Sequence, residues 1–134
     1  MRTLEIPAKD WTRALDDFSV VHDRWLISLE VLSPTLGAQP QICDLPLLGV
    51  TAESRARDST ITIAAGGPEA GHVEHVIHAP TRVRLERTNE GADVALEIES
   101  ADGTAAILRF KTVVPSEIVD DLVHRGESSP SRCT

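Results

Sequence analysis

The chain has 134 residues, of which 41% are hydrophobic and 25% charged, a composition typical of a soluble globular protein. One domain of this length buries a hydrophobic core without needing disulfides or a metal. The formal net charge is −8, and there are two Trp, two Phe and no Tyr, so both a basic footprint and a supply of stacking rings are missing. We therefore do not expect a nucleic-acid partner.

The chain shows no targeting or membrane signal. Its first residues, MRTLEIPAKDW, lack the apolar core of a signal peptide, and no apolar run reaches the ~20 residues that cross a bilayer. The two cysteines, Cys43 and Cys133, do not have the spacing of a metal site. We expect a cytoplasmic protein with no membrane partner and no cofactor.

A helix is expected from about Ala8 to Val21, because apolar residues recur there on a 3.6-residue period. Residues 25–32 then alternate as a strand. A second strand over about residues 39–51 contains Pro46, which cannot donate a ladder hydrogen bond, so we expect this strand to be an edge or to be broken there. Gly49 marks an expected bend or bulge. Shorter strands are expected over residues 60–63 and 72–78.

Residues 81–110 predict a three-stranded antiparallel meander, since two turn signals separate three alternating segments. Pairing Leu85 with Leu96 keeps the apolar residues of the first two strands on one face. The opposite face then pairs opposite charges, Arg84 with Glu97 and Arg82 with Glu99.

The second turn of the meander contains Asp102-Gly103. A two-residue turn would place the apolar residues of the flanking strands on opposite faces. A three-residue loop with Gly103 in the left-handed region keeps them in phase, with Ile98 opposite Ala106 and Leu96 opposite Leu108. We predict the bulged loop.

Residues 115–125 predict a short closing helix, and residues 127–134 predict a disordered tail. The order of elements predicts a single α+β domain over residues 1–126 that is mostly antiparallel β. We expect a small, partly closed barrel, SH3-like or Sm-like, extended by a C-terminal hairpin. An N-terminal helix and the short C-terminal helix accompany it.

Several blocks of the sequence are distinctive: Trp11, Phe18-Ser19, His22 and Trp25, then APTRVRLE at 79–86, ALEIESADGT at 95–104 and LRF at 108–110. Together they resemble an uncharacterised bacterial family of small proteins classed as a domain of unknown function. The resemblance covers roughly Thr3 to Val114. It implies no activity, cofactor or site residue.

The strongest candidate for metal chemistry is the strand that holds His72, His75 and His78. Strand alternation places His75 on the opposite face from the other two, so the three cannot share one ion. His72 and Glu74 share a face and could bind zinc with a third ligand from elsewhere. The competing interpretation is that His75 is partly buried and hydrogen-bonded while the others are solvated.

Carboxylates form a second candidate, because two of them can divide acid and base roles. In the predicted register, however, Glu97 and Glu99 face arginines, which favour the ionised state of both. We therefore favour a structural role for this charged face. The residues expected to act structurally are Gly49, Gly103, Arg82, Arg84, Glu97 and Glu99.

Two functions are weighed against each other, and a third, capture of a ligand in the barrel mouth under the first helix, also stays open. The favoured one is a non-enzymatic binding or assembly module that pairs through exposed sheet edges with a protein partner or a second copy. The candidate edges are the strand containing Pro46 and the last strand, residues 105–111. The alternative is a small metal-dependent hydrolase centred on the strand from His72 to His78. An enzyme is the less expected of the two.

Overall fold

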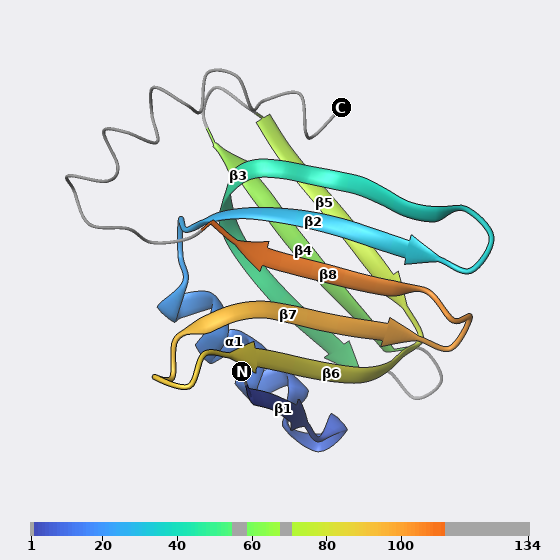
Figure 1. The fold of residues 1–134 in the computed structure, drawn as a ribbon, viewed down its shortest axis with the longest axis horizontal. Helices are drawn as coiled ribbons and strands as arrows, with labels where there is room; N and C mark the ends of the chain where they lie inside the picture. The colour runs from blue at the N-terminus through green and yellow to red at the C-terminus, as the bar shows by residue number, and fades with distance from the viewer. Residues whose placement is uncertain (1, 55–58, 68–70, 112–134) are drawn as a thin grey trace.

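The computed structural model describes residues 2–54, 59–67 and 71–111. The eight strands in these ranges form one antiparallel sheet in the order β1-β6-β7-β8-β2-β3-β4-β5 (Figure 1). The strands are β1 (Arg2–Ile6), β2 (Leu26–Ser33), β3 (Gly37–Ser54), β4 (Ser59–Gly67), β5 (Gly71–His78), β6 (Pro80–Arg87), β7 (Asp93–Ser100) and β8 (Ala105–Phe110). A 3₁₀ turn, Ala8–Asp10, leads into the helix α1 (Trp11–Val21).

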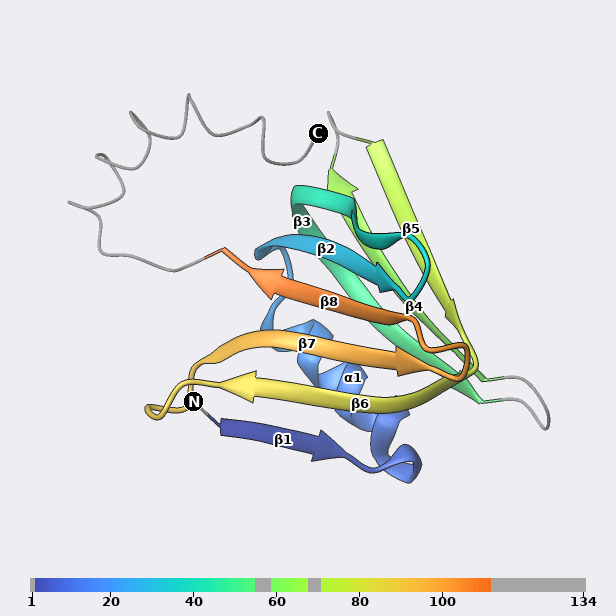
Figure 2. The same cartoon turned by 45° about the vertical axis from the view of Figure 1, so that its right-hand side comes forward.

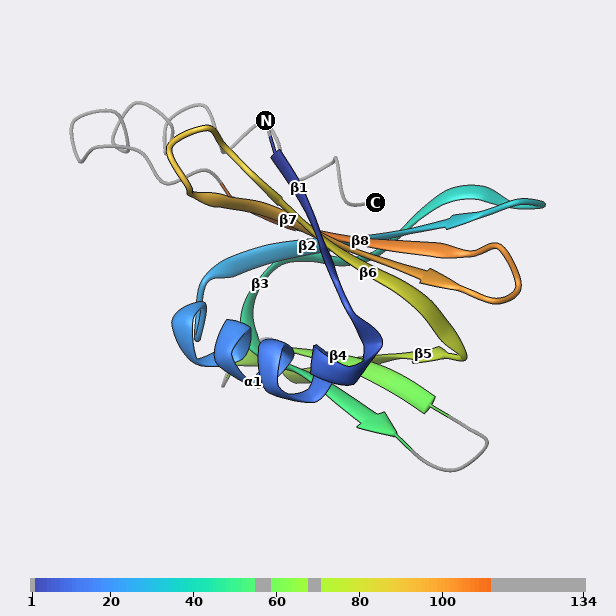
Figure 3. The ribbon, with the colours of Figure 1, turned by 90° about the horizontal axis from the view of Figure 1, so that it is seen from below.

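The predicted α+β class with a mostly antiparallel sheet is confirmed. The sheet is open, with β1 and β5 at its two ends, so the expected partly closed barrel is not confirmed. The sheet instead folds over itself, and β4 and β5 pass beneath the layer formed by β6, β7, β8 and β2 (Figures 2 and 3). Helix α1 runs along the open side of this folded sheet, against β3.

The core between these layers is aliphatic, as the scarcity of aromatic residues predicts. Its largest fully buried hydrophobic side chains are Leu15, Ile27, Leu29, Leu47, Val50, Ile61, Ile63, Val83, Leu96, Ile98 and Leu108. Helix α1 contributes Trp11, Leu15 and Phe18 to this core, which confirms the apolar stripe expected from the 3.6-residue period. No described helix is long and apolar enough to span a membrane.

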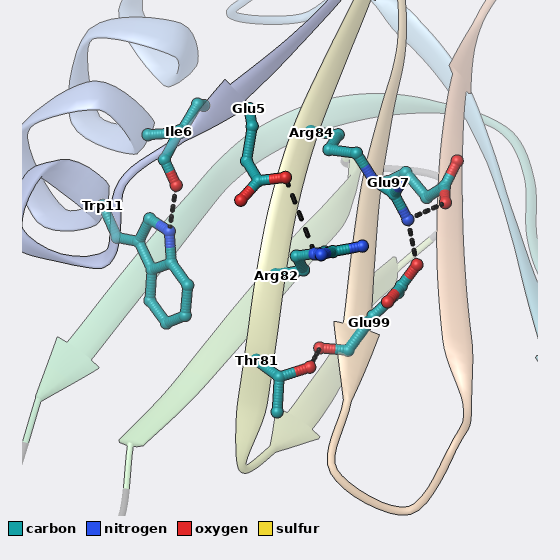
Figure 4. Close-up of polar contacts among 8 residues, drawn as sticks. All are labelled: Glu5, Ile6, Trp11, Thr81, Arg82, Arg84, Glu97 and Glu99. Carbon is teal, nitrogen blue, oxygen red and sulfur yellow. Dashed lines mark hydrogen bonds and ion pairs between the residues drawn. The ribbon is translucent and has the colours of Figure 1, made fainter.

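Strand β1 was not expected from the sequence. It pairs with β6, with Leu4 opposite Leu85 and Ile6 opposite Val83. Four of its five residues are exposed, so it lacks the buried alternation from which a strand is predicted. The indole N–H of Trp11 donates a hydrogen bond to the Ile6 carbonyl oxygen at 2.8 Å, which fastens the end of β1 to the start of α1 (Figure 4).

Strand β3 changes partner along its length. Residues 37–46 pair with β2, and residues 47–54 pair with β4. The ladder therefore breaks directly after Pro46, which is one of the two alternatives expected for this strand. Because each half of β3 has one strand neighbour, Pro46 needs no second ladder partner. The register shift between Leu47 and Gly49 confirms the expected bulge.

Helix α1 covers the side of β3 that lacks a strand. The Ser19 hydroxyl oxygen accepts a hydrogen bond from the Val50 N–H at 2.8 Å. It also lies 2.7 Å from the Leu15 carbonyl oxygen and 3.0 Å from that of Val50, two acceptors within reach of its proton. A helix side chain thus supplies the backbone contact that a neighbouring strand would otherwise make.

The meander has the predicted register. Leu85 lies opposite Leu96 across the first turn, and Leu96 lies opposite Leu108 across the second. Gly103 has φ +88°, so the bulged three-residue loop is confirmed. The strand β8 nevertheless lies between β7 and β2, and its expected edge position is wrong. The closing helix and tail expected over residues 115–134 lie outside the described residues.

We expect Ser19→Ala to lower the free energy of unfolding by about 1–3 kcal/mol, because the Val50 N–H loses its acceptor in a partly buried site. Urea unfolding followed by circular dichroism measures the change. Thr12→Ala removes an exposed hydroxyl from the same helix and serves as the control, with a change within about 0.5 kcal/mol. Equal changes for the two variants would contradict a bridging role for Ser19.

Candidate functional site

A groove of about 400 Å³ lies between α1 and the β1 end of the sheet. This volume falls within the range of about 300–1,000 Å³ found for ligand pockets. Its walls are mostly apolar, and four charged or titratable residues complete them. The lining residues are Leu4, Ile6, Ala14, Asp17, Phe18, Val21, His22, Leu85, Arg87 and Asp93.

The register of β1 and β6 determines which side chains line the groove along its length. Directly opposite residues of an antiparallel pair share a face, and the face alternates with period two. Leu4 faces Leu85 on the inner face, and two residues earlier in β1 Arg2 faces Arg87. The groove is therefore apolar in its middle, and two arginines face each other at the end where β1 begins.

His22 follows the last residue of α1 and lines the groove. Its ring is 2% exposed and is the one fully buried polar side chain among the described residues. Its Nδ1 lies 2.8 Å from the Phe18 carbonyl oxygen, and its Nε2 lies 3.0 Å from Oδ2 of Asp93. Since a carbonyl oxygen only accepts, Nδ1 carries a proton.

Asp93 joins His22 to β6. The Arg87 Nε donates to Oδ1 of Asp93 at 2.6 Å, while the other carboxylate oxygen faces His22. Asp93 therefore lies between Arg87 and His22, with one carboxylate oxygen at each. Both ring nitrogens of His22 have a protein oxygen within hydrogen-bond distance.

Aromatic rings surround the His22 imidazole. Phe110 stacks on it at 4.5 Å with an interplanar angle of 19°, and Phe18 lies 4.4 Å from it. Trp25 meets the ring at 4.6 Å with its plane nearly perpendicular. Rings at these distances pack against the imidazole and exclude water from it. His22 therefore contacts β7 through Asp93 and β8 through Phe110.

This geometry limits the chemistry that His22 can perform. A general base needs one ring nitrogen directed at the substrate, and both nitrogens of His22 are already hydrogen-bonded inside the protein. The groove lining contains no Ser, Thr, Cys or Lys that could act as a nucleophile.

Arg87 has N–H groups that make no hydrogen bond within the described chain. Its Nε is used by Asp93, but its terminal Nη groups have no partner within the described ranges, and its side chain is 40% exposed. Arg2 lies directly opposite on the same face. Like charges in that position destabilise an antiparallel pair unless an anion lies between them.

The histidines predicted as metal candidates lie elsewhere, on β5. His72 Nε2 is 3.6 Å from a Glu74 carboxylate oxygen, and both side chains are exposed. Among residues 2–54, 59–67 and 71–111 no group of three potential ligands forms, so the third ligand expected for this pair is not found there. His75 is half-buried on the opposite face, as strand alternation predicts, and burial lowers its pKa.

The charged residues predicted as structural lie on the outer face of the sheet (Figure 4). Arg84 contacts Glu97 at 3.0 Å and also Glu99. Arg82 pairs instead with Glu5 of β1 at 3.6 Å, although it lies opposite Glu99 in the ladder. The register prediction is therefore confirmed, and the contact of Arg82 differs because β1 supplies a carboxylate that the sequence did not reveal.

We expect Asp93→Asn to lower the free energy of unfolding by about 1.5–3 kcal/mol, because an amide replaces the carboxylate that serves both His22 and Arg87. Chemical unfolding at pH 7 measures the loss. Asp23→Asn changes an exposed aspartate close to His22 in the chain and is the matched control. A loss for Asp93→Asn no larger than the control's would contradict the bridging role.

His75 should make stability fall toward acid pH. Its lowered pKa means that the folded protein resists the proton that the unfolded chain accepts near its usual value of about 6.5. The stabilisation is therefore present above that pH and is lost as the pH falls below it. Unfolding measured at about pH 7.5 and pH 5.5 should show a smaller acid loss in His75→Asn than in the wild type.

The difference between these two proteins should persist at high salt, because desolvation causes the shift and salt screens only exposed charges. Identical pH dependence in the two proteins would rule out this contribution of His75.

Sequence reasoning missed this groove and its charged end. The apolar stripe of α1 brings His22 close to Phe18, one turn earlier, and that was the signal available. Nothing local connects His22 with Asp93, and β1 was not expected at all. The residues singled out beforehand on β5 and on the outer face do not line the groove.

Comparison with known proteins agrees with the sequence resemblance. An uncharacterized protein of Aquifex aeolicus (strain VF5) is 27% identical over 115 residues, which covers 86% of this chain and 97% of that protein. No solved structure matches the fold. A family of unknown function, DUF5335, matches residues 2–118, and the chain belongs to this family.

Proposed function

We propose that this protein is a non-enzymatic binding module that takes an extended peptide segment of a partner protein into the groove between β1 and α1. The observation that carries the proposal is the position of β1. It ends the sheet and at the same time forms one wall of the groove. An incoming strand would therefore meet free backbone groups and apolar walls at one place.

The outer edge of β1 is available for pairing. On the side away from β6, its backbone groups have no strand partner in the described part of the chain. Residues Arg2 to Glu5 are exposed, while the carbonyl of Ile6 is already bound by Trp11. Strand addition to such an edge provides main-chain hydrogen bonds for any sequence.

The groove supplies what would make the binding selective. Side chains of an added strand alternate in direction, so every second one would point into the groove. There Leu4, Leu85 and Ala14 offer an apolar surface. Both nitrogens of His22 are within hydrogen-bond distance of protein oxygens, and no described Ser, Thr, Cys or Lys lines the groove, which favours binding over turnover.

Among the described residues, the cavity at the β5 end of the sheet is smaller than the groove at β1. A cavity of about 180 Å³ lies beside β5, lined by His75, Val76, Ile77 and His78 together with residues of the β7–β8 turn. Its volume is less than half of the 400 Å³ at β1. The β1 edge is therefore the better candidate for a peptide site.

A library of random decapeptides with free C-termini, displayed on phage, tests this proposal with the purified protein. We expect selection of peptides with alternating apolar residues, because alternate side chains enter the groove. Adding a selected peptide should shift the backbone amide NMR signals of β1 and α1. Failure to select any peptide, or shifts confined to β5, would overturn the proposal.

Ala14→Leu supplies the matched variant. The larger side chain occupies part of the groove and should weaken peptide binding by about tenfold or more. Thr12→Leu adds the same side chain at an exposed position of α1 that does not line the groove, and its affinity should stay at the wild-type level. Equal affinities of the two variants would place the peptide outside the groove.

A further inference from the structure

Two facing arginines at one end of the groove are unusual for a surface that binds only apolar side chains. Arg2 and Arg87 lie opposite each other on the groove face, and the imidazole of His22 lines the groove on the side of α1. Asp93 is the carboxylate within this cluster, and both of its oxygens are occupied. Asp17, on the exposed side of α1, is the other carboxylate that lines the groove. Arg2 and the terminal nitrogens of Arg87 are therefore the positive groups at this end that no described carboxylate contacts.

The terminal nitrogens of Arg87 point to the kind of anion that fits. A guanidinium presents its N–H groups as a planar fork, which matches the two oxygens of a carboxylate. The contact with Asp93 uses Nε and fixes the side chain, while the Nη groups remain without a partner in the described chain. An arginine held in this way loses little conformational entropy when it binds a carboxylate.

The direction of the strands determines which part of a peptide reaches this end. β1 begins at Arg2, so a segment that adds to it in antiparallel fashion finishes beside Arg2 and Arg87. At the other end of β1, Trp11 occupies the carbonyl of Ile6. The last residue of the bound segment therefore lies next to the two arginines.

We infer that the groove recognises the C-terminus of its partner protein, with the terminal carboxylate bound between Arg2 and Arg87 and the preceding apolar side chain against Leu4 and Leu85. This inference rests on the proposed function. It accounts for the two like charges that face each other across β1 and β6, where Glu5 and Arg82 form an ion pair.

A selected peptide tests the inference when it is synthesised with a free C-terminus and as the C-terminal amide. Isothermal titration calorimetry should show about tenfold weaker binding of the amide, because the amide removes the charge that the arginines receive. In Arg87→Gln, and separately in Arg2→Gln, the difference between the two peptides should shrink to about threefold or less. Arg13→Gln, an exposed change on α1 outside the groove, should keep the full difference.

Two variants are needed because Arg87 also contacts Asp93, whereas Arg2 has no ion pair among the described residues. Equal binding of the free acid and the amide would overturn the inference and leave the proposed function standing. An amide peptide ending in aspartate that binds as tightly as the free acid would also overturn it. Failure of every peptide form to bind would instead remove the proposed function.

Discussion

The buried imidazole of His22 is the contact on which the arrangement of helix and sheet depends. Burying a polar ring costs free energy unless its nitrogens have hydrogen-bond partners. Here Nδ1 binds the last turn of α1 through Phe18, and Nε2 binds Asp93 at the start of β7. Asp93 in turn holds Arg87 at the end of β6, and Phe110 of β8 stacks on the ring. One side chain therefore sets the distance between α1 and three strands.

This position of α1 explains why the sheet stays open. The helix lies along β3, where the hydroxyl of Ser19 binds the backbone of Val50 in place of a neighbouring strand. With that side covered by a helix, β3 has no need of a second strand partner along residues 47–54. The sheet then ends at β1, which keeps one edge free. The groove arises because α1 is held at its two ends, by Trp11 and by His22, and faces small or apolar residues between them.

Local patterns were enough to predict the meander but not the sheet around it. The register of β6 and β7 follows from period-two alternation, and the loop at Gly103 follows from keeping the apolar faces in phase. The central position of β8 and the exposed strand β1 depend on partners far away in the chain, which alternation does not reveal. For the same reason the candidate site was not predicted, since His22 meets Asp93 only after α1 and the sheet have packed. The bulge at Gly49 was foreseen because glycine between apolar residues is itself the signal.

An exposed strand edge normally invites uncontrolled pairing, and the structure restricts this one. β1 has five residues, it carries Arg2 and Glu5, and the indole of Trp11 blocks its last carbonyl. Short length and charge are the means by which proteins discourage edge-to-edge aggregation. The two charges have different surroundings. Glu5 forms an ion pair with Arg82 on the outer face, whereas Arg2 lies opposite another arginine on the groove face. Protection of the edge accounts for the exposed charges of β1, and the proposed binding of a carboxylate would offset the repulsion between Arg2 and Arg87.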